Sequence, residues 1–132
     1  MRRFFPAVLV AALVTVGALV GASPAQAATC NGASCYGKNP YTEGCAGDAY
    51  TPTGAAFSSA AGYVELRYSP SCNANWAKVS NSYAGAWLYV QNQYGHSQQT
   101  YVPSGVTGTY TLMVTGETGA RAGNSHSYTG WY

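Results

Sequence analysis

Apolar and polar residues alternate along the stretch that follows Gly62. Between Tyr63 and Tyr68, Val64 and Leu66 share one side of an extended chain, while the charged residues share the other. This alternation predicts a strand with one buried face. Similar short runs, separated by clusters of Asn, Gly, Pro and Ser, predict further strands at residues 76–80, 84–92, 99–102 and 109–115.

Two other segments complete the predicted architecture. Residues 28–54 are rich in Gly, Asn, Pro and Thr and show no periodicity, so we expect an irregular, cysteine-rich leader segment. Residues 55–61 are a weak helix candidate because of their Ala and Ser content, and we expect a strand or loop there. The fold class is therefore all-β, a small disulfide-stabilised sandwich or partly open barrel. Residues 28–54 and the β region 55–132 form one globular domain.

The N-terminal 27 residues have the pattern of a signal peptide. Arg2 and Arg3 form a basic head, and the apolar run that follows ends at Ser23 and Pro24. The A-x-A sequence then predicts cleavage after Ala27. A membrane anchor is the alternative, but the apolar run is shorter than the roughly 20 residues that a spanning helix needs. We therefore expect a secreted, extracellular protein.

Cleavage removes the excess of positive charge. The remaining 105 residues carry four basic and four acidic side chains, so the mature chain is neutral. Binding to nucleic acid or to an anionic membrane surface requires clustered basic residues. The scattered charges exclude both partner classes. The many aromatic residues and few charges indicate a folded chain.

Four cysteines lie in the first half of the mature chain, and an exported chain oxidises its thiols. We therefore expect two disulfides, for which three pairings are possible. We favour Cys30 with Cys35, because this pair closes a short glycine-containing loop. Cys45 would then join Cys72 and pin the leader segment to the central strand.

Metal binding is the competing use of four cysteines. Their spacings, C-x4-C followed by gaps of 9 and 26 residues, contain no C-x2-C knuckle. We therefore expect no metal site and no other cofactor. An even number of cysteines in an exported chain also leaves no free thiol for a nucleophile.

The acidic residues and histidines indicate structure rather than catalysis. We expect Asp48 to accept backbone hydrogen bonds in the turn after Cys45, and Glu65 to form a structural charge pair with Arg67. A pairing of Glu65 with Lys78 across a strand edge is the alternative. Glycoside hydrolysis needs two carboxyl groups within roughly 5–10 Å, and the four carboxylates lie far apart along the chain.

His96 and His126 each lie in a Gly-, Ser- or Asn-rich loop. No G-x-S-x-G elbow or other nucleophile signature accompanies them. We therefore predict no catalytic residues.

Aromatic side chains supply the candidate binding residues. Trp87 and Tyr89 lie in the predicted strand 84–92, and Tyr128, Trp131 and Tyr132 lie in the C-terminal tail. We expect the tail to form the last strand and to pack its rings inward. In the alternative, the rings are exposed and offer a partner both apolar area and polar atoms.

Several short motifs recur in a fixed order and carry a resemblance to a known family. They are G-K-N-P at Gly37–Pro40, G-C at Gly44–Cys45, D-A at Asp48–Ala49, V-E-L-R-Y-S-P-x-C at Val64–Cys72 and W-A-K at Trp76–Lys78. Over most of residues 30–80 the chain resembles the actinobacterial secreted family called domain of unknown function 2690. A looser similarity continues over residues 110–122, and the tail beyond Ala122 is less similar.

The resemblance implies a fold signature and no chemistry. It implies that Cys72 locks the strand, that Trp76 fills the core and that Glu65 and Arg67 form an ordered charge pair. Members of the family are exported or membrane-tethered domains without an assigned function.

Two functional hypotheses follow. The first is a non-catalytic extracellular interaction module, a subunit or adaptor of a secreted multiprotein complex such as an antibacterial particle, with another secreted protein as its partner. The alternative is a carbohydrate or cell-wall binding module with weak hydrolase activity, which would use Trp87, Tyr89 or Trp131 for stacking. A secreted hydrolase inhibitor is a third hypothesis.

Overall fold

The computed structural model describes residues 27–132, and the predicted signal peptide, apart from Ala27, lies outside these residues. The described chain forms two antiparallel sheets and two short 3-10 helices, η1 (Gly32–Cys35) and η2 (Ala46–Asp48). The strands are β1 (Ala56–Ser59), β2 (Gly62–Ser69), β3 (Ala74–Ser80), β4 (Trp87–Asn92), β5 (Ser97–Tyr101), β6 (Thr109–Tyr110), β7 (Val114–Thr115) and β8 (Ala120–Asn124). The predicted all-β sandwich is confirmed, and the described strands do not close into a barrel.

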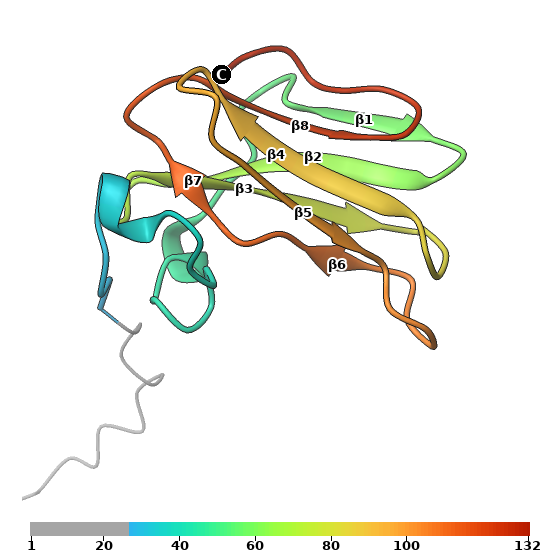
Figure 1. The fold of residues 1–132 in the computed structure, drawn as a ribbon, viewed down its shortest axis with the longest axis horizontal. Helices are drawn as coiled ribbons and strands as arrows, with labels where there is room; N and C mark the ends of the chain where they lie inside the picture. The colour runs from blue at the N-terminus through green and yellow to red at the C-terminus, as the bar shows by residue number, and fades with distance from the viewer. Residues whose placement is uncertain (1–26) are drawn as a thin grey trace, which may run out of the picture.

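The larger sheet is built on the hairpin of β2 and β3. Its strand order is β1-β2-β3-β6, and β7 also pairs with β3 (Figure 1). Leu66 lies opposite Ala77 and Val64 opposite Val79, so these four apolar side chains share one face of the sheet. The alternation seen in the sequence places that face against the core. Residues 55–61 contribute β1, which agrees with the expectation of a strand or loop.

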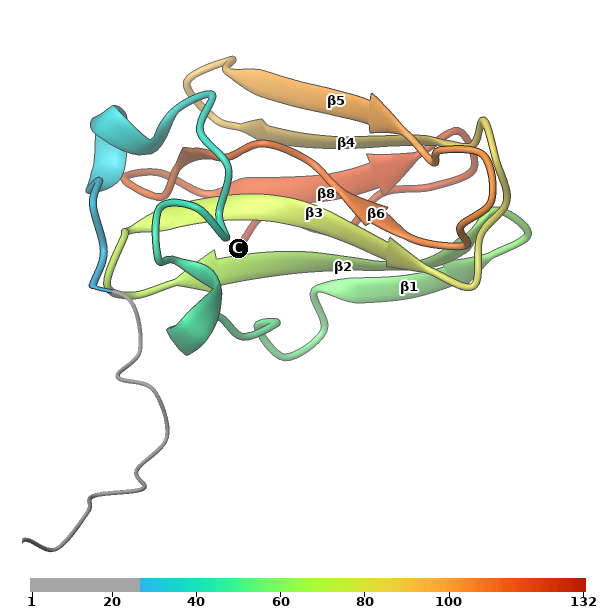
Figure 2. The same cartoon turned by 90° about the horizontal axis from the view of Figure 1, so that it is seen from below.

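The smaller sheet has the order β5-β4-β8 and lies against the larger one (Figure 2). Leu88 and Val90 of β4 are completely buried in the same cluster as Val64 and Leu66. Each fully buried side chain of this size stabilises the fold by about 1.5–3 kcal/mol relative to an exposed one. The core therefore lies between the two sheets.

β8 was not predicted from the sequence. Its residues, A-R-A-G-N, have low strand propensity. Ala120 and Ala122 are nevertheless completely buried in the core, where their small side chains fill the space beside β4. Tertiary packing, rather than local preference, makes this segment a strand.

The predicted strand at residues 109–115 is divided into β6 and β7. Between them, the Thr111 hydroxyl accepts a hydrogen bond from the backbone N–H of Ala77 at 3.0 Å, in place of a backbone carbonyl. Met113 turns its backbone toward the leader segment, donating to the carbonyl of Lys38 and accepting from the N–H of Gly37. Met113 thus pairs with the leader segment instead of with β3, and the strand is interrupted there.

The leader segment gathers at one end of the sandwich (Figures 1 and 2). The structure joins Cys30 to Cys35 and Cys45 to Cys72, the pairing favoured from the sequence. All four cysteines are buried, and they pack with Trp76 and Met113 in a second apolar cluster, which we call the disulfide cluster. Trp76 lies opposite Arg67 in the register, so its ring projects from the outer face of the larger sheet rather than into the core between the sheets.

Among residues 27–132, the structure contains no helix of the length and apolar character that crossing a membrane requires.

The two disulfides are expected to differ in their contribution to stability. Loop entropy predicts that Cys45→Ala/Cys72→Ala lowers the free energy of unfolding by roughly 3 kcal/mol and Cys30→Ala/Cys35→Ala by roughly 2 kcal/mol, because the first pair closes the longer loop. Urea unfolding followed by tryptophan fluorescence measures both values, and Trp76 reports directly on the disulfide cluster. A larger loss for the Cys30/Cys35 variant would contradict this order.

Candidate functional site

The outer side of the smaller sheet carries a group of aromatic side chains. Trp87 and Tyr89 project from β4 on the side opposite to the buried Leu88 and Val90. Their rings stack with centroids 4.7 Å apart and planes inclined by 30°. The Trp87 indole Nε1 donates a hydrogen bond to Gln99 of β5 at 3.1 Å, which fixes the orientation of the pair.

The C-terminal tail brings two more rings to this side. Residues 125–132 turn back along β8, where the N–H of Thr129 donates to the carbonyl of Ala122 and Tyr132 exchanges two backbone hydrogen bonds with Ala120. The tail therefore pairs as a last strand would. The expectation that its rings pack inward was wrong, because Tyr128 is 60% exposed and Trp131 is 42% exposed.

Arg121 of β8 holds the tail rings in place. Its guanidinium lies 4.6 Å from the ring centroid of Tyr128 and 4.5 Å from that of Trp131. The same guanidinium donates two hydrogen bonds to Gln91 of β4, at 3.0 and 3.3 Å. Each cation–π contact contributes about 0.5–1 kcal/mol at an exposed position. Arg121 was not singled out from the sequence, because its role depends on the pairing of β4 with β8.

Gly123 of β8 leaves room for the Tyr89 ring of β4 to lie close to the tail rings. Tyr89 lies opposite Gly123 in the register, and a methyl group on Gly123 would come within 2.5 Å of the Tyr89 ring. Burial raises the pKa of the Tyr89 hydroxyl, the positive charge of Arg121 lowers it and Tyr128 raises it, with a net increase. Tyr89 thus remains a neutral hydrogen-bond donor. We call Trp87, Tyr89, Arg121, Tyr128 and Trp131 the aromatic face.

A hollow of about 310 Å³ adjoins the aromatic face. It is lined by the Trp87 and Tyr89 rings together with polar residues of β4 and β5, among them Gln91 and Gln99. Four of the five aromatic candidates from the sequence therefore converge on one surface. The fifth, Tyr132, lies elsewhere.

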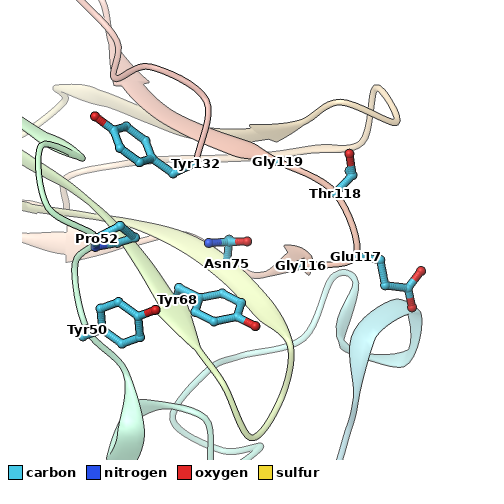
Figure 3. A pocket seen from close by; sticks show the side chains of 9 residues that line it. All are labelled: Tyr50, Pro52, Tyr68, Asn75, Gly116, Glu117, Thr118, Gly119 and Tyr132. Atoms are coloured by element: carbon cyan, nitrogen blue, oxygen red, sulfur yellow. The ribbon is translucent and has the colours of Figure 1, made fainter.

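Tyr132 lines a larger hollow of about 520 Å³ at the end of the sandwich (Figure 3), which we call the end pocket. Tyr50 and Pro52 of the leader segment form one wall, and Tyr68 of β2 and Asn75 of β3 form another. The connection between β7 and β8, residues 116–119, closes a further side. No sequence pattern predicts this site, because its residues come from five separate segments.

The histidines lie apart from both sites. His96 is exposed and stacks on Tyr36 of the leader segment, with centroids 4.6 Å apart. His126 follows β8, and its backbone N–H donates to Asn124. In the described part of the chain, neither imidazole is hydrogen-bonded to a carboxylate or a serine hydroxyl.

The four cysteine sulfurs lie within 4.8 Å of one another, a spacing that also suits a metal ion. Both pairs are oxidised to disulfides, and a metal ligand has to be a thiolate. The cluster in this state is structural.

Comparison with family models assigns the chain to a family. The model of a family described as protein of unknown function (DUF2690) matches residues 33–125. The chain belongs to this family. Neither the curated proteins nor the solved structures contained a match.

The DUF2690 match divides the aromatic face. It includes Trp87, Tyr89 and Arg121, and it ends before Tyr128 and Trp131. The tail rings therefore lie outside the matched region, and the arginine that contacts them lies within it.

The charged residues of the DUF2690 motif hold the leader segment against β2. The Thr51 hydroxyl donates to Glu65 and accepts from Arg67, both at 3.1 Å, and Arg67 also donates to the carbonyl of Ala49. Glu65 and Arg67 are thus linked through this hydroxyl rather than by the direct charge pair that was predicted.

Asp48 also holds the leader segment against the larger sheet, through the serines near the end of the Val64–Cys72 motif. Its carboxylate accepts hydrogen bonds from the Ser69 hydroxyl at 2.6 Å and from the backbone N–H of Ser71 at 2.8 Å. Burial raises the pKa of the Asp48 carboxyl, but the hydrogen bonds from Ser69 and Ser71 outweigh it and leave the pKa below its ordinary value. The expectation that Asp48 accepts backbone hydrogen bonds in the turn after Cys45 was wrong about the place, because Ser69 and Ser71 lie at the end of β2 and in the turn that follows it.

The lowered pKa of Asp48 predicts an acid-sensitive contribution to stability. The unfolded chain binds this proton more tightly, so the contribution is complete above the unfolded pKa of about 4 and is lost as the pH falls through the lower folded pKa. Asp48→Asn is expected to reduce the free energy of unfolding modestly at pH 7 and to flatten its decrease below pH about 4. Urea unfolding at several pH values measures both effects. An unchanged acid limb in Asp48→Asn would contradict this assignment.

Proposed function

We propose that this chain is an exported, non-catalytic module that binds another protein through the aromatic face, as a subunit or adaptor of an extracellular complex. The observation that carries the proposal is the convergence of Trp87, Tyr89, Tyr128 and Trp131 around Arg121 on the outer side of one sheet. Trp, Tyr and Arg are the residues that contribute most to the binding energy at protein interfaces.

The aromatic face is ordered before any partner binds. Arg121 is held by Gln91, and Trp87 is held by Gln99. Binding a partner therefore costs less side-chain entropy than it would with free rings, by about 0.5–1.5 kcal/mol for each side chain already fixed. The adjoining hollow of about 310 Å³ offers a place for a partner side chain.

Export is supported by the N-terminal sequence pattern together with the two disulfides, which form and persist in oxidising compartments. The neutral mature chain favours recognition by shape and apolar contact over electrostatic steering.

Protein binding is favoured over sugar binding at the aromatic face because neighbouring side chains already cover the ring surfaces. Trp87 and Tyr89 cover one another, and Arg121 covers one side of Tyr128 and of Trp131. A sugar platform requires open ring faces for stacking. A packed group of rings around an arginine is instead typical of the centre of a protein interface.

The proposal predicts a partner that depends on the tail rings. Tagged protein purified from the culture supernatant of its own source is expected to recover one secreted protein in stoichiometric amount. With that partner purified, Tyr128→Ala and Trp131→Ala are each expected to raise its Kd by roughly 30-fold, the loss typical of an interface hot spot. Calorimetric titration measures the change.

Tyr83→Ala is the matched control, because Tyr83 is 52% exposed and lies outside the aromatic face. Its Kd is expected to equal that of the unmodified protein. Thermal melting of each variant verifies that the fold is retained. Equal affinity in the Trp131→Ala, Tyr128→Ala and Tyr83→Ala variants, or repeated recovery of the chain without a partner, would refute the proposal.

A further inference from the structure

The end pocket lies apart from the aromatic face and presents a polar atom that the described residues leave available to a ligand. Asn75 is 3% exposed, and its amide nitrogen donates to the carbonyl of Arg67 at 3.1 Å. No hydrogen bond from the described residues reaches the amide oxygen of Asn75, which stays accessible from the pocket that this residue lines. Because this oxygen is accessible, water or a ligand that enters the pocket can donate a hydrogen bond to it.

Tyrosine rings form the walls around Asn75. Tyr68 lies directly opposite Asn75 in the register, so both project toward the inner side of the larger sheet. The Tyr50 and Tyr68 rings meet edge to face, with centroids 5.9 Å apart and planes at 88°. Tyr132 closes the pocket from the C-terminal tail (Figure 3).

The walls are held by backbone hydrogen bonds rather than by flexible side chains alone. Tyr50 and Tyr68 exchange two of them, at 2.9 and 3.0 Å, and Tyr132 exchanges two with Ala120, at 2.8 and 2.9 Å. The Tyr68 hydroxyl donates to Asn73 at 3.1 Å, which orients its ring. The end pocket is therefore formed before a ligand enters, as most small-molecule sites are.

No charged side chain points into the pocket. Glu117 is the one ionised residue among those that line it, and its side chain points away from the pocket (Figure 3). Its carboxylate accepts a hydrogen bond from the backbone N–H of Ala33 at 3.1 Å and lies against Gly32, where a larger residue would collide with it. A charged ligand would find no counter-charge on a side chain there, so the lining favours a neutral ligand.

We propose that the end pocket binds a neutral pyranose unit of a polysaccharide. The C–H groups of a sugar ring pack on the tyrosine faces, and a sugar hydroxyl or acetamido N–H donates to the free Asn75 oxygen. The volume of about 520 Å³ lies within the roughly 300–1,000 Å³ range of ligand sites. This site is independent of the aromatic face and of the proposed protein partner.

Titration of the isotope-labelled full domain with chitotetraose and with cellotetraose tests the proposal by NMR. Amide shifts are expected at residues 50–52, 68, 75 and 116–119. Tyr50→Ala and Tyr132→Ala are each expected to weaken binding about tenfold, the effect of losing one aromatic contact. Tyr50→Phe retains the ring and is expected to bind with nearly the original affinity.

Trp131→Ala and Tyr83→Ala are the controls, and both are expected to leave sugar binding unchanged. Because Trp131→Ala removes the proposed protein contact and Tyr50→Ala does not, the two proposals fail separately. Absence of saturable binding by both tetrasaccharides would overturn the pyranose site. Loss of sugar binding in Trp131→Ala with full binding in Tyr50→Ala would also overturn it and would assign the sugar to the aromatic face.

Discussion

The Cys45–Cys72 disulfide is the constraint on which the rest of the molecule depends. It joins the irregular leader segment to the turn before β3, and the second disulfide and Trp76 pack around it on the outer face of the larger sheet. Asp48 reinforces the same junction through Ser69 and Ser71. Without these links, a segment of 27 residues that contains only two short 3-10 helices would have little buried area to oppose its conformational entropy.

Fixing the leader segment has consequences at three other places. It supplies the pairing partner of Met113, which divides β6 from β7. It brings Tyr50 beside Tyr68 and so forms one wall of the end pocket. It also gives Glu117 a backbone donor at Ala33, so that this carboxylate points away from the pocket and no charged side chain enters it. The leader segment that the disulfides hold thus contributes to the chemistry of the end pocket.

The aromatic face depends on a different element, the pairing of β4 with β8. That pairing places Arg121 beside Gln91 and Gly123 under Tyr89, so one strand of small residues supports rings from both β4 and the tail. The two surfaces of the domain therefore have separate structural origins. A protein partner at one and a neutral sugar at the other would be compatible, and such a chain could connect a secreted complex to a polysaccharide.

The amino-acid sequence determined the elements whose signal is local. Alternation in Tyr63–Tyr68 predicts β2 because a strand places successive side chains on opposite faces. The even number of cysteines behind a predicted signal peptide predicts the disulfides. The motifs that include Val64–Cys72 likewise predict the family, and the match over residues 33–125 confirms it. Only the tertiary structure determined β8, the exposure of the tail rings and the end pocket. Ala and Gly carry no strand signal of their own, and Tyr50, Asn75 and Tyr132 become neighbours only when segments far apart in the chain are packed together. The conformational preference of a short segment carries no information about a contact with residues tens of positions away. Both candidate sites are built from such contacts.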